Sequence, residues 1–336
     1  MGLQKSCSFE SSMSKLTEIK STVQDELKIF DKHFKSSMKS SLPLLDKITR
    51  FIVKRKGKQM RPIFVFLSAN ICGGIHEKTY RAASLIELLH TATLVHDDVV
   101  DDSNERRGFF SLNALWKNKI AVLVGDYLLS KGLFIALENK DYNLLEIVSK
   151  AVNEMSEGEL LQIEKARKLN IKETIYFDII RKKTASLIAS CCATGAASAG
   201  ADKKTIEKMH LFGEYVGISF QIKDDLFDYE KFNKTGKPSA IDIKEQKMTL
   251  PLIYMLNNTT FSEKRKIINI IKNHSNNSGK ISEVIRKVNE SGGIEYTKNK
   301  MFEYREKALT LLDDFSDSPS KSALKELVIY TTERKK

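Results

Sequence analysis

The chain has 336 residues, 41% of them hydrophobic, which is enough to bury one large core or two modest ones. Lysine and arginine outnumber aspartate and glutamate by 55 to 43, and the net charge of +12 suits an anionic partner such as a phosphorylated small molecule, an anionic membrane or nucleic acid. The sequence has neither a Cys/His zinc spacing nor a basic stretch interleaved with aromatic residues, so nucleic acid is not favoured.

Four cysteines, Cys7, Cys72, Cys191 and Cys192, show no disulfide-framework spacing, so we expect reduced thiols in a cytoplasmic protein. The N-terminal stretch is rich in Ser, Lys and Glu and has no apolar segment, so we expect no signal peptide. The most membrane-like stretch, residues 185–201, is short for a membrane span. We interpret it as a buried, closely packed helix and expect no transmembrane segment.

Apolar residues recur at helical spacing through most of the chain. The sequence has five prolines, none of them between Pro62 and Pro238, and lacks the Asn-Gly and Asp-Gly signals of β-hairpins. The polar segment 230–246 breaks the pattern and predicts a surface loop. We expect helices near residues 12–37, 42–53, 62–72, 77–102, 111–137, 142–167, 172–199, 202–229, 247–257, 261–273, 279–289, 294–314 and 320–333. Long helices of this kind predict an all-α, single-domain bundle around a deep central cavity.

The pattern Asp-Asp-x-x-Asp occurs twice in these helices, at residues 97–101 and 224–228. Because residues four apart lie on one face of a helix, the first and last aspartate of each cluster point the same way. Like charges at that spacing repel, so we expect cations to neutralise them. Carboxylate oxygens suit hard ions, and Mg²⁺ usually binds through one or two carboxylates together with substrate phosphates. The two clusters therefore predict a magnesium-diphosphate site.

A basic motif, Gly57-Lys58-x-x-Arg61-Pro62, lies upstream of the first cluster. Proline is favoured at the first position of a helix, so Pro62 is predicted to begin one. Lys58 and Arg61 then lie near a helix N-terminus, where free backbone N–H groups and the helix dipole favour anions. This arrangement indicates a second diphosphate site, with Arg61 able to bind phosphate oxygens in a bidentate way.

Taken together, these motifs resemble those of the trans-isoprenyl diphosphate synthase (polyprenyl synthetase) family, and most closely those of its long-chain members. The motifs span residues 57 to about 252. In chain order they are Gly57-Lys58-x-x-Arg61-Pro62, His90, Asp97-Asp98-x-x-Asp101, Arg106-Arg107-Gly108, Lys183-Thr184, Phe220-Gln221, Asp224-Asp225-x-x-Asp228, Gly236-Lys237-Pro238 and Lys247-Met248-Thr249-Leu250-Pro251-Leu252. The resemblance implies one polyprenyl synthetase domain over residues 1–336, with the motif-bearing core in about 42–257 and further helices in about 258–336.

In that family an allylic prenyl diphosphate is elongated head to tail by isopentenyl diphosphate, and pyrophosphate is released. The resemblance implies three Mg²⁺ ions per site, bound by Asp97, Asp101, Asp224 and Asp228. Two neighbouring carboxylates would support these ligands, Asp98 and Asp225. The allylic diphosphate would be held by Arg106, Lys183, Thr184, Gln221, Lys237 and Lys247. Isopentenyl diphosphate would be held by Lys58, Arg61, His90 and Arg107. The residues expected to act in catalysis are Asp97, Asp101, Arg106, Lys183 and Asp224.

Several of these residues have plainer interpretations when they are taken one at a time. A lone histidine such as His90 is usually an ordinary core or surface residue. Thr184 could be a helix hydroxyl bonded to the backbone, and Gln221 a surface amide. The segment 230–246 is either a mobile connection or a lid that brings Lys237 and Lys247 to the second cluster.

Product length is predicted from the residues just before the first cluster. Thr93 lies about one helical turn, or roughly 6 Å, below Asp97, and Ala92 is its neighbour. In the family, bulky aromatic residues here close the cavity and stop growth early. The small residues therefore predict a deeper tunnel and a long polyprenyl product, such as a quinone side-chain precursor. The plainer explanation is that Ala92 and Thr93 are small because two helices approach closely, and the alternative product is farnesyl or geranylgeranyl diphosphate.

The resemblance also implies a homodimer. Two other functions are considered. A terpene cyclase would not need Lys58, Arg61 and Arg107 for a second diphosphate, and a non-catalytic prenyl-binding subunit of a heteromeric synthase would typically lose one aspartate cluster. Asp102 has no assigned role, and the basic run 334–336 could either close over the site or be a frayed terminus.

Overall fold

The computed structural model describes residues 15–54, 57–103, 105–106, 109–166, 172–235 and 241–334. Helices make up nearly all the regular structure in these ranges, so the predicted all-α class is confirmed. Residues 15–21 are helical. The elements that follow are α2 (Gln24–Ser37), α3 (Pro43–Lys54), α4 (Met60–Ile71), α5 (Glu77–Val100), β1 (Glu105–Arg106), β2 (Phe109–Phe110), α6 (Leu112–Glu138), α7 (Tyr142–Ala166), α8 (Glu173–Ile180), the π-helical turn η1 (Arg181–Ala185), α9 (Ser186–Ser198), α10 (Lys203–Thr235), α11 (Ile241–Lys244), α12 (Leu250–Asn257), α13 (Phe261–Asn273), α14 (Ser278–Glu290), α15 (Gly293–Leu311) and α16 (Pro319–Glu333).

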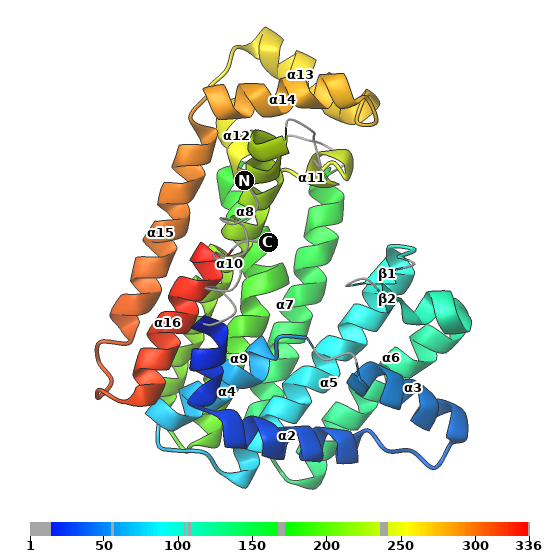
Figure 1. Cartoon of the computed structure of the whole chain (residues 1–336), viewed down its shortest axis with the longest axis vertical. Coiled ribbons are helices and arrows are strands. Elements are labelled where there is room, and N and C mark those ends of the chain that lie inside the picture. The colour runs from blue at the N-terminus through cyan, green and yellow to red at the C-terminus, as the bar shows by residue number, and fades with distance from the viewer. Residues whose placement is uncertain are drawn as a thin grey trace, which may run out of the picture.

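The long helices form one bundle, with shorter helices across its two ends (Figure 1). Helices α7, α9, α10 and α15 run along its length. Helix α2 lies across one end, and α13 and α14 lie across the other. Two clusters of buried apolar side chains fill the interior. The first includes residues of α4, α5 and α9, and the second gathers α8, α12 and α14 around α10.

The structure corrects three expectations about the elements. The segment predicted as a loop at 230–246 is helical up to Thr235, and a short helix, α11, covers Ile241–Lys244. The helix predicted at 12–37 is interrupted by a turn at residues 22–23. Two-residue strands β1 and β2 pair antiparallel after α5. No strands were expected there, because the sequence lacks hairpin signals.

Helices α9 and α10 pack closely because glycines lie between them. A Cβ atom on Gly213 would come within 2.6 Å of the Cα of Ala189, and one on Gly217 within 2.4 Å of the Cα of Ala185. Every residue of α9 is buried except Ile188. The stretch 185–201 is therefore the buried, closely packed helix that the sequence predicted.

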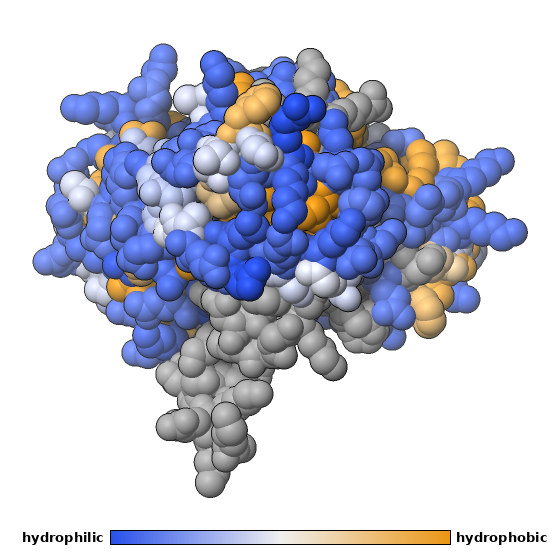
Figure 2. Space-filling view, turned by 90° about the horizontal axis from the view of Figure 1, so that it is seen from above, coloured by the Kyte–Doolittle hydropathy of each residue, from blue (hydrophilic) through white to orange (hydrophobic). Residues whose placement is uncertain are grey.

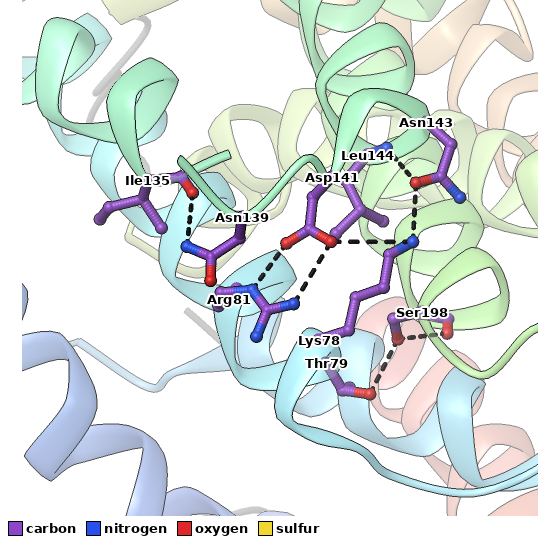
Figure 3. A network of polar contacts seen from close by, with 10 residues as sticks. Lys78, Thr79, Arg81, Ile135, Asn139, Asp141, Asn143, Leu144 and Ser198 are labelled. Atoms are coloured by element: carbon purple, nitrogen blue, oxygen red, sulfur yellow. Dashed lines mark hydrogen bonds and ion pairs between the residues drawn. The ribbon is translucent and has the colours of Figure 1, made fainter. Parts of the chain in front are cut away.

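A polar network fixes the beginning of α5 to the connection between α6 and α7 (Figure 3). The Nε and Nη2 atoms of Arg81 donate to the two carboxylate oxygens of Asp141 at 2.6 and 3.3 Å. The Nζ of Lys78 lies 3.8 Å from the same carboxylate. On the other side, the hydroxyl of Ser198 donates to the hydroxyl of Thr79 at 2.9 Å and ties α9 to α5. The network fixes the helix that carries the first aspartate cluster at the end opposite that cluster.

Among the described residues, α6 is the one helix long and apolar enough to span a bilayer by length and composition, and 33% of its apolar window is buried. Figure 2 shows a mainly hydrophilic surface with apolar groups at its right edge, on the side where α6 lies in Figure 1. Large apolar side chains are exposed on α6 and at both ends of α7: Leu115, Val122, Leu123, Phe134, Leu137, Tyr142, Leu160 and Ile163. This apolar face of α6 and α7 is available for contact with another surface.

Candidate active site

The first aspartate cluster lies at the C-terminal end of α5. Asp97 and Asp101 are exposed, and the Asp101 amide donates to the Asp97 carbonyl at 2.8 Å, which closes the last turn. Asp98 is buried, and its carbonyl accepts from the Ser103 amide at 3.0 Å and from the Asn113 side chain at 3.1 Å. A helix C-terminus carries partial negative charge, so the dipole adds to the acidic side chains. Local structure and charge both favour a cation here.

The two residues proposed to limit product length lie one turn earlier on α5. Ala92 is only 2% exposed, whereas Thr93 is half-buried. The Thr93 hydroxyl donates to the His90 carbonyl at 2.9 Å, as helix threonines commonly do. The depth of the apolar cavity beneath them stays a prediction.

A buried chain of hydrogen bonds surrounds the second aspartate of the second cluster. The Thr184 hydroxyl donates to the Gln221 amide oxygen at 2.9 Å, and the Gln221 NH₂ donates to Asp225 at 3.0 Å. The Tyr176 hydroxyl donates to the other oxygen of Asp225 at 2.7 Å. Three helical segments, α8, η1 and α10, are thus joined through one carboxylate, which fixes the amide and the hydroxyl at the site.

Burial raises the pKa of Asp225 to about 7, while the hydrogen bonds from Gln221 and Tyr176 act in the opposite direction. The pKa of Tyr176 is raised by its own burial and by the adjacent carboxylate. Both carboxylate oxygens of Asp225 already accept hydrogen bonds from Tyr176 and Gln221, which leaves them less available to an ion. The position of Asp225 fits the supporting role expected for it.

Asp224, the first residue of the same cluster, is paired with an arginine from the end of α16. The Nη2 of Arg334 donates to Asp224 Oδ1 at 2.5 Å. The guanidinium also lies 3.9 Å from the ring centroid of Phe220, one turn earlier on α10. A frayed terminus, one of the two expectations for the basic run 334–336, is therefore wrong for Arg334, because an ion pair and an aromatic ring hold this residue. Residues 335 and 336 lie outside the described part of the chain.

A π-helical turn places the lysine of the Lys-Thr motif. Lys183 lies in η1, where the wider turn interrupts the α-helical register, and π-helical turns of this kind often lie at functional sites. Gly158 on α7 allows the close approach, because a Cβ atom there would come within 2.6 Å of the Lys183 amide nitrogen. The Lys183 ammonium pairs with Glu159 and lies 3.3 Å from the Gln162 amide oxygen. The backbone of η1 and two side chains of α7 thus define the position of this cation.

A cavity of about 210 Å³ brings several predicted residues together beside the second cluster. Its lining includes Lys183, Thr184, Gln221, Asp225 and Lys247. Four residues predicted to hold the allylic diphosphate, distant in sequence, therefore border one space, and two of them carry positive charge.

Lys247 enters this cavity from the segment before α12. Burial is the largest influence on the pKa of Lys247 and lowers it, but the hydrogen bond to Glu245 at 2.6 Å and the nearby carboxylate charges together outweigh burial, and the net shift is upward. Asp242 lies 3.7 Å from the same ammonium. The lysine is therefore a firmly protonated cation at the edge of the cavity.

The basic motif before the first cluster lies at the start of α4. The helix begins at Met60, two residues before the predicted start, after Gln59 in a left-handed conformation with φ of 55°. Pro62 falls in the first turn, where an N–H group is not needed. Lys58 is exposed just before the helix, and Arg61 lies in its first turn, as expected for residues near a helix N-terminus.

Both cations of this motif have partners that the sequence did not indicate. Arg61 makes a bidentate contact with Glu87 on α5, at 2.7 and 3.2 Å. The Lys58 ammonium donates to the Tyr330 hydroxyl on α16 at 3.1 Å. His90, half-buried, lies one turn after Glu87 on α5. The motif is thus held against α5 on one side and α16 on the other.

Of four further predicted residues, two are not described and two are described in part. Arg107 and Lys237 lie outside the described residues. Arg106 belongs to β1 and Asp228 to α10, and the structure describes their backbone only. The sequence also predicts that the two aspartate clusters face each other at the mouth of the central cavity, and this stays a prediction.

Sequence reasoning missed the side chains that support the site. Tyr176 and Glu87 belong to no recognised motif, and their partners lie far away in sequence. A signal existed at the end of α16, because Tyr330 and Arg334 are four residues apart, a spacing that places two helical residues on the same side. The pattern could not reveal what that face contacts.

An all-α bundle with acidic clusters on α5 and α10 and a cation-lined cavity beside the second cluster is the architecture of a prenyltransferase. The chain belongs to the polyprenyl synthetase family, whose sequence model matches residues 42–288. It is 32% identical over 321 residues to heptaprenyl diphosphate synthase component 2 from Geobacillus stearothermophilus, covering 95% of this chain and 99% of the relative.

Two solved structures illustrate the similarity. A decaprenyl diphosphate synthase from Rhodobacter capsulatus has a TM-score of 0.89 and 30% identity, covering 95% of this chain and 98% of that one. A polyprenyl synthase from Caulobacter crescentus complexed with calcium and isoprenyl diphosphate has a TM-score of 0.85 and 28% identity, with the same coverage. The long-chain resemblance seen in the sequence is supported by relatives that make long polyprenyl chains.

Proposed function

We propose that the protein condenses isopentenyl diphosphate head to tail with an allylic prenyl diphosphate, releases pyrophosphate and makes a long-chain trans-polyprenyl diphosphate for a quinone side chain. The observation that carries the proposal is the cavity beside the second aspartate cluster. Lys183 and Lys247 provide its positive charge, and Thr184 and Gln221 provide hydrogen-bonding groups. Such a lining suits the diphosphate end of an allylic substrate.

The proposed reaction begins with cleavage of the allylic C–O bond, which leaves a carbocation and a multiply charged diphosphate. The alkene of isopentenyl diphosphate then attacks the cation, and transfer of a proton to the released diphosphate restores a double bond. Lys183, Lys247 and Arg106 would stabilise the leaving group by charge. Lys58, Arg61, His90 and Arg107 would hold the diphosphate of the second substrate.

The carboxylates fit Mg²⁺ that is shared with a substrate diphosphate. The part of the chain that the structure describes has no group of three or more His, Cys, Asp or Glu side chains that could hold an ion alone. Mg²⁺ in proteins is usually bound by one or two carboxylates and completed by substrate phosphate oxygens. The ligands would be Asp97, Asp101, Asp224 and Asp228, for three ions. Bound Mg²⁺ supplies positive charge where negative charge develops on the departing diphosphate.

Small residues at Ala92 and Thr93 and the long-chain names of the relatives support a long product. The shorter farnesyl or geranylgeranyl product is the alternative, and analysis of product length decides between them.

We infer that the protein is a cytoplasmic homodimer of single-domain chains, joined through the apolar face of α6 and α7. Apolar side chains such as Leu123, Phe134 and Leu160 are more than half exposed there, which is costly without a covering surface. A second copy would cover them without a membrane. The relative named component 2 makes an unlike partner the alternative. Light scattering of the purified chain tests this, and a monomer that is active only with a second protein would contradict the homodimer.

The function is tested by incubating the purified chain with Mg²⁺, farnesyl diphosphate and labelled isopentenyl diphosphate. Labelled polyprenyl product is the expected result. Cyclic hydrocarbon made without isopentenyl diphosphate would indicate a terpene cyclase, and complete inactivity of the folded chain would favour a non-catalytic subunit.

Two substitutions separate the roles of the residues. Asp97→Ala should lower kcat by about 10²- to 10³-fold, the range for loss of one transition-state stabilising group. Lys58→Ala should chiefly raise KM for isopentenyl diphosphate. Asp25→Ala, which removes an exposed carboxylate on α2, is the matched control. A wild-type rate in Asp97→Ala would contradict the metal assignment.

A further inference from the structure

The last turn of α16 and its capping residue, Arg334, together contact both proposed diphosphate subsites. Tyr330 binds Lys58 of the isopentenyl diphosphate subsite at 3.1 Å. Four residues later, Arg334 binds Asp224 of the second aspartate cluster. The Arg334 amide donates to the Tyr330 carbonyl at 3.0 Å, so one helical turn joins the two contacts rigidly.

Arg334 is held in place by more than one interaction. Its side chain is 17% exposed and Asp224 is 38% exposed, so solvent screens the pair only partly. The guanidinium lies 3.9 Å from the centroid of Phe220 and 5.5 Å from that of Phe227, distances at which a cation is attracted to an aromatic ring. The two rings flank Asp224 on α10 and keep the arginine beside it.

The contact places a guanidinium on an oxygen that a metal ion would use. Two cations cannot share Asp224 Oδ1 at contact distance without strong repulsion. An ion that binds Asp224 Oδ1 must therefore displace Arg334, and the energy of the arginine contact is subtracted from the binding energy of that ion.

We propose that Arg334 is a positioning residue that holds Asp224 in the metal-free enzyme and competes with the metal ion for it, and that Tyr330 couples this exchange to the position of Lys58. The proposal rests on the proposed function, since it takes Asp224 as a ligand and Lys58 as a diphosphate-binding residue. Binding of the metal ion to the second aspartate cluster then releases the end of α16.

The test measures Mn²⁺ binding to the metal-free full chain in the presence of inorganic diphosphate. The electron paramagnetic resonance signal of free Mn²⁺ reports how much of the ion is unbound. Arg334→Gln should tighten the weakest Mn²⁺ site by about three- to tenfold, the range expected when a partly screened ion pair stops competing. Lys325→Gln should leave binding unchanged. Lys325 lies earlier in α16, and its charge is paired with Asp313 instead of with the second aspartate cluster. Unchanged or weaker binding in Arg334→Gln overturns the proposal.

Two further measurements test the coupling. Hydrogen exchange in residues 328–334 should accelerate when Mn²⁺ and diphosphate are added, and unchanged exchange would overturn release of the helix end. Tyr330→Phe should raise KM for isopentenyl diphosphate by about fivefold, as for one lost hydrogen bond, with kcat nearly unchanged. An unchanged KM would contradict the proposed coupling between Tyr330 and Lys58. Product formation by the wild-type chain tests the proposed function, whereas Mn²⁺ binding tests Arg334 whether or not product is made.

Discussion

Removal of the Tyr176 hydroxyl should destabilise the protein more at high pH than at low pH. The hydroxyl donates to the buried Asp225 at 2.7 Å, and the pKa of that carboxyl is about 7. A hydrogen bond to a charged group contributes about 1.5–3 kcal/mol and one between neutral groups about 0.5–1.5 kcal/mol. Tyr176→Phe should therefore lower the free energy of unfolding by about 1 kcal/mol more when Asp225 is ionised than when it is protonated.

The sign follows from proton binding in the two states. The pKa of Asp225 in the folded protein is about 7, well above the value of about 3.9 for an aspartate in an unfolded chain. Between these values the folded state binds more protons, so this carboxyl stabilises the protein fully below the lower pKa, and that contribution is lost as pH rises through the upper one. Removing the tyrosine hydrogen bond raises the pKa of Asp225 in the folded protein further. The free energy of unfolding then decreases by more as the pH rises.

Urea unfolding of the metal-free protein, with chelator present, measures this difference at about pH 5.5 and about pH 8.5, on either side of the pKa of about 7. Thr194→Val is the matched control, because the buried Thr194 hydroxyl donates at 2.7 Å to the backbone carbonyl of Ser190, a partner that does not ionise. The control should lose the same free energy at both pH values. If Tyr176→Phe also loses equal amounts, Asp225 is not the group whose charge the tyrosine stabilises.

Three more predictions concern the backbone, the network at the start of α5 and the product. Gly158→Ala should lower kcat/KM for the allylic substrate by about ten- to a hundredfold, because the new methyl group displaces Lys183; an unchanged value would show that η1 can move without loss. Asp141→Ala should lower the free energy of unfolding by about 2–3 kcal/mol through loss of the bidentate contact with Arg81, and a loss under about 0.5 kcal/mol would contradict that. Ala92→Phe should shorten the polyprenyl product seen by chromatography, and an unchanged product would place the end of the cavity elsewhere.

The sequence predicted the helices well because each buries an apolar face at regular spacing. The prediction at 62–72 matches α4 (Met60–Ile71), and the one at 261–273 matches α13. The errors lie where tertiary contacts decide. Polar composition at 230–246 predicted a loop, yet α10 continues through its first six residues. Composition alone could not show that a long helix would extend beyond its buried part.

Motif residues were easier to predict than the side chains around them. Lys183, Thr184, Gln221 and Lys247 were named from the sequence, and they line one cavity. Tyr176 was not, because a single tyrosine in an apolar helix has the same pattern as any core residue. Its role comes from a partner 49 positions away, which only the folded chain reveals.

The wide turn η1 also divides the hydrophobic interior. Tyr176, Ile179 and Ile180 before it belong to one apolar cluster, whereas Leu187 and Cys191 after it belong to the other. One residue corresponds to about 100° of rotation around an α-helix axis. Deleting a residue from 181–185 to restore regular winding would therefore rotate α9 relative to α8 by about that angle. The extra residue thus determines how α9 is rotated relative to α8. The fold should therefore tolerate a substitution in residues 181–185 far better than a deletion.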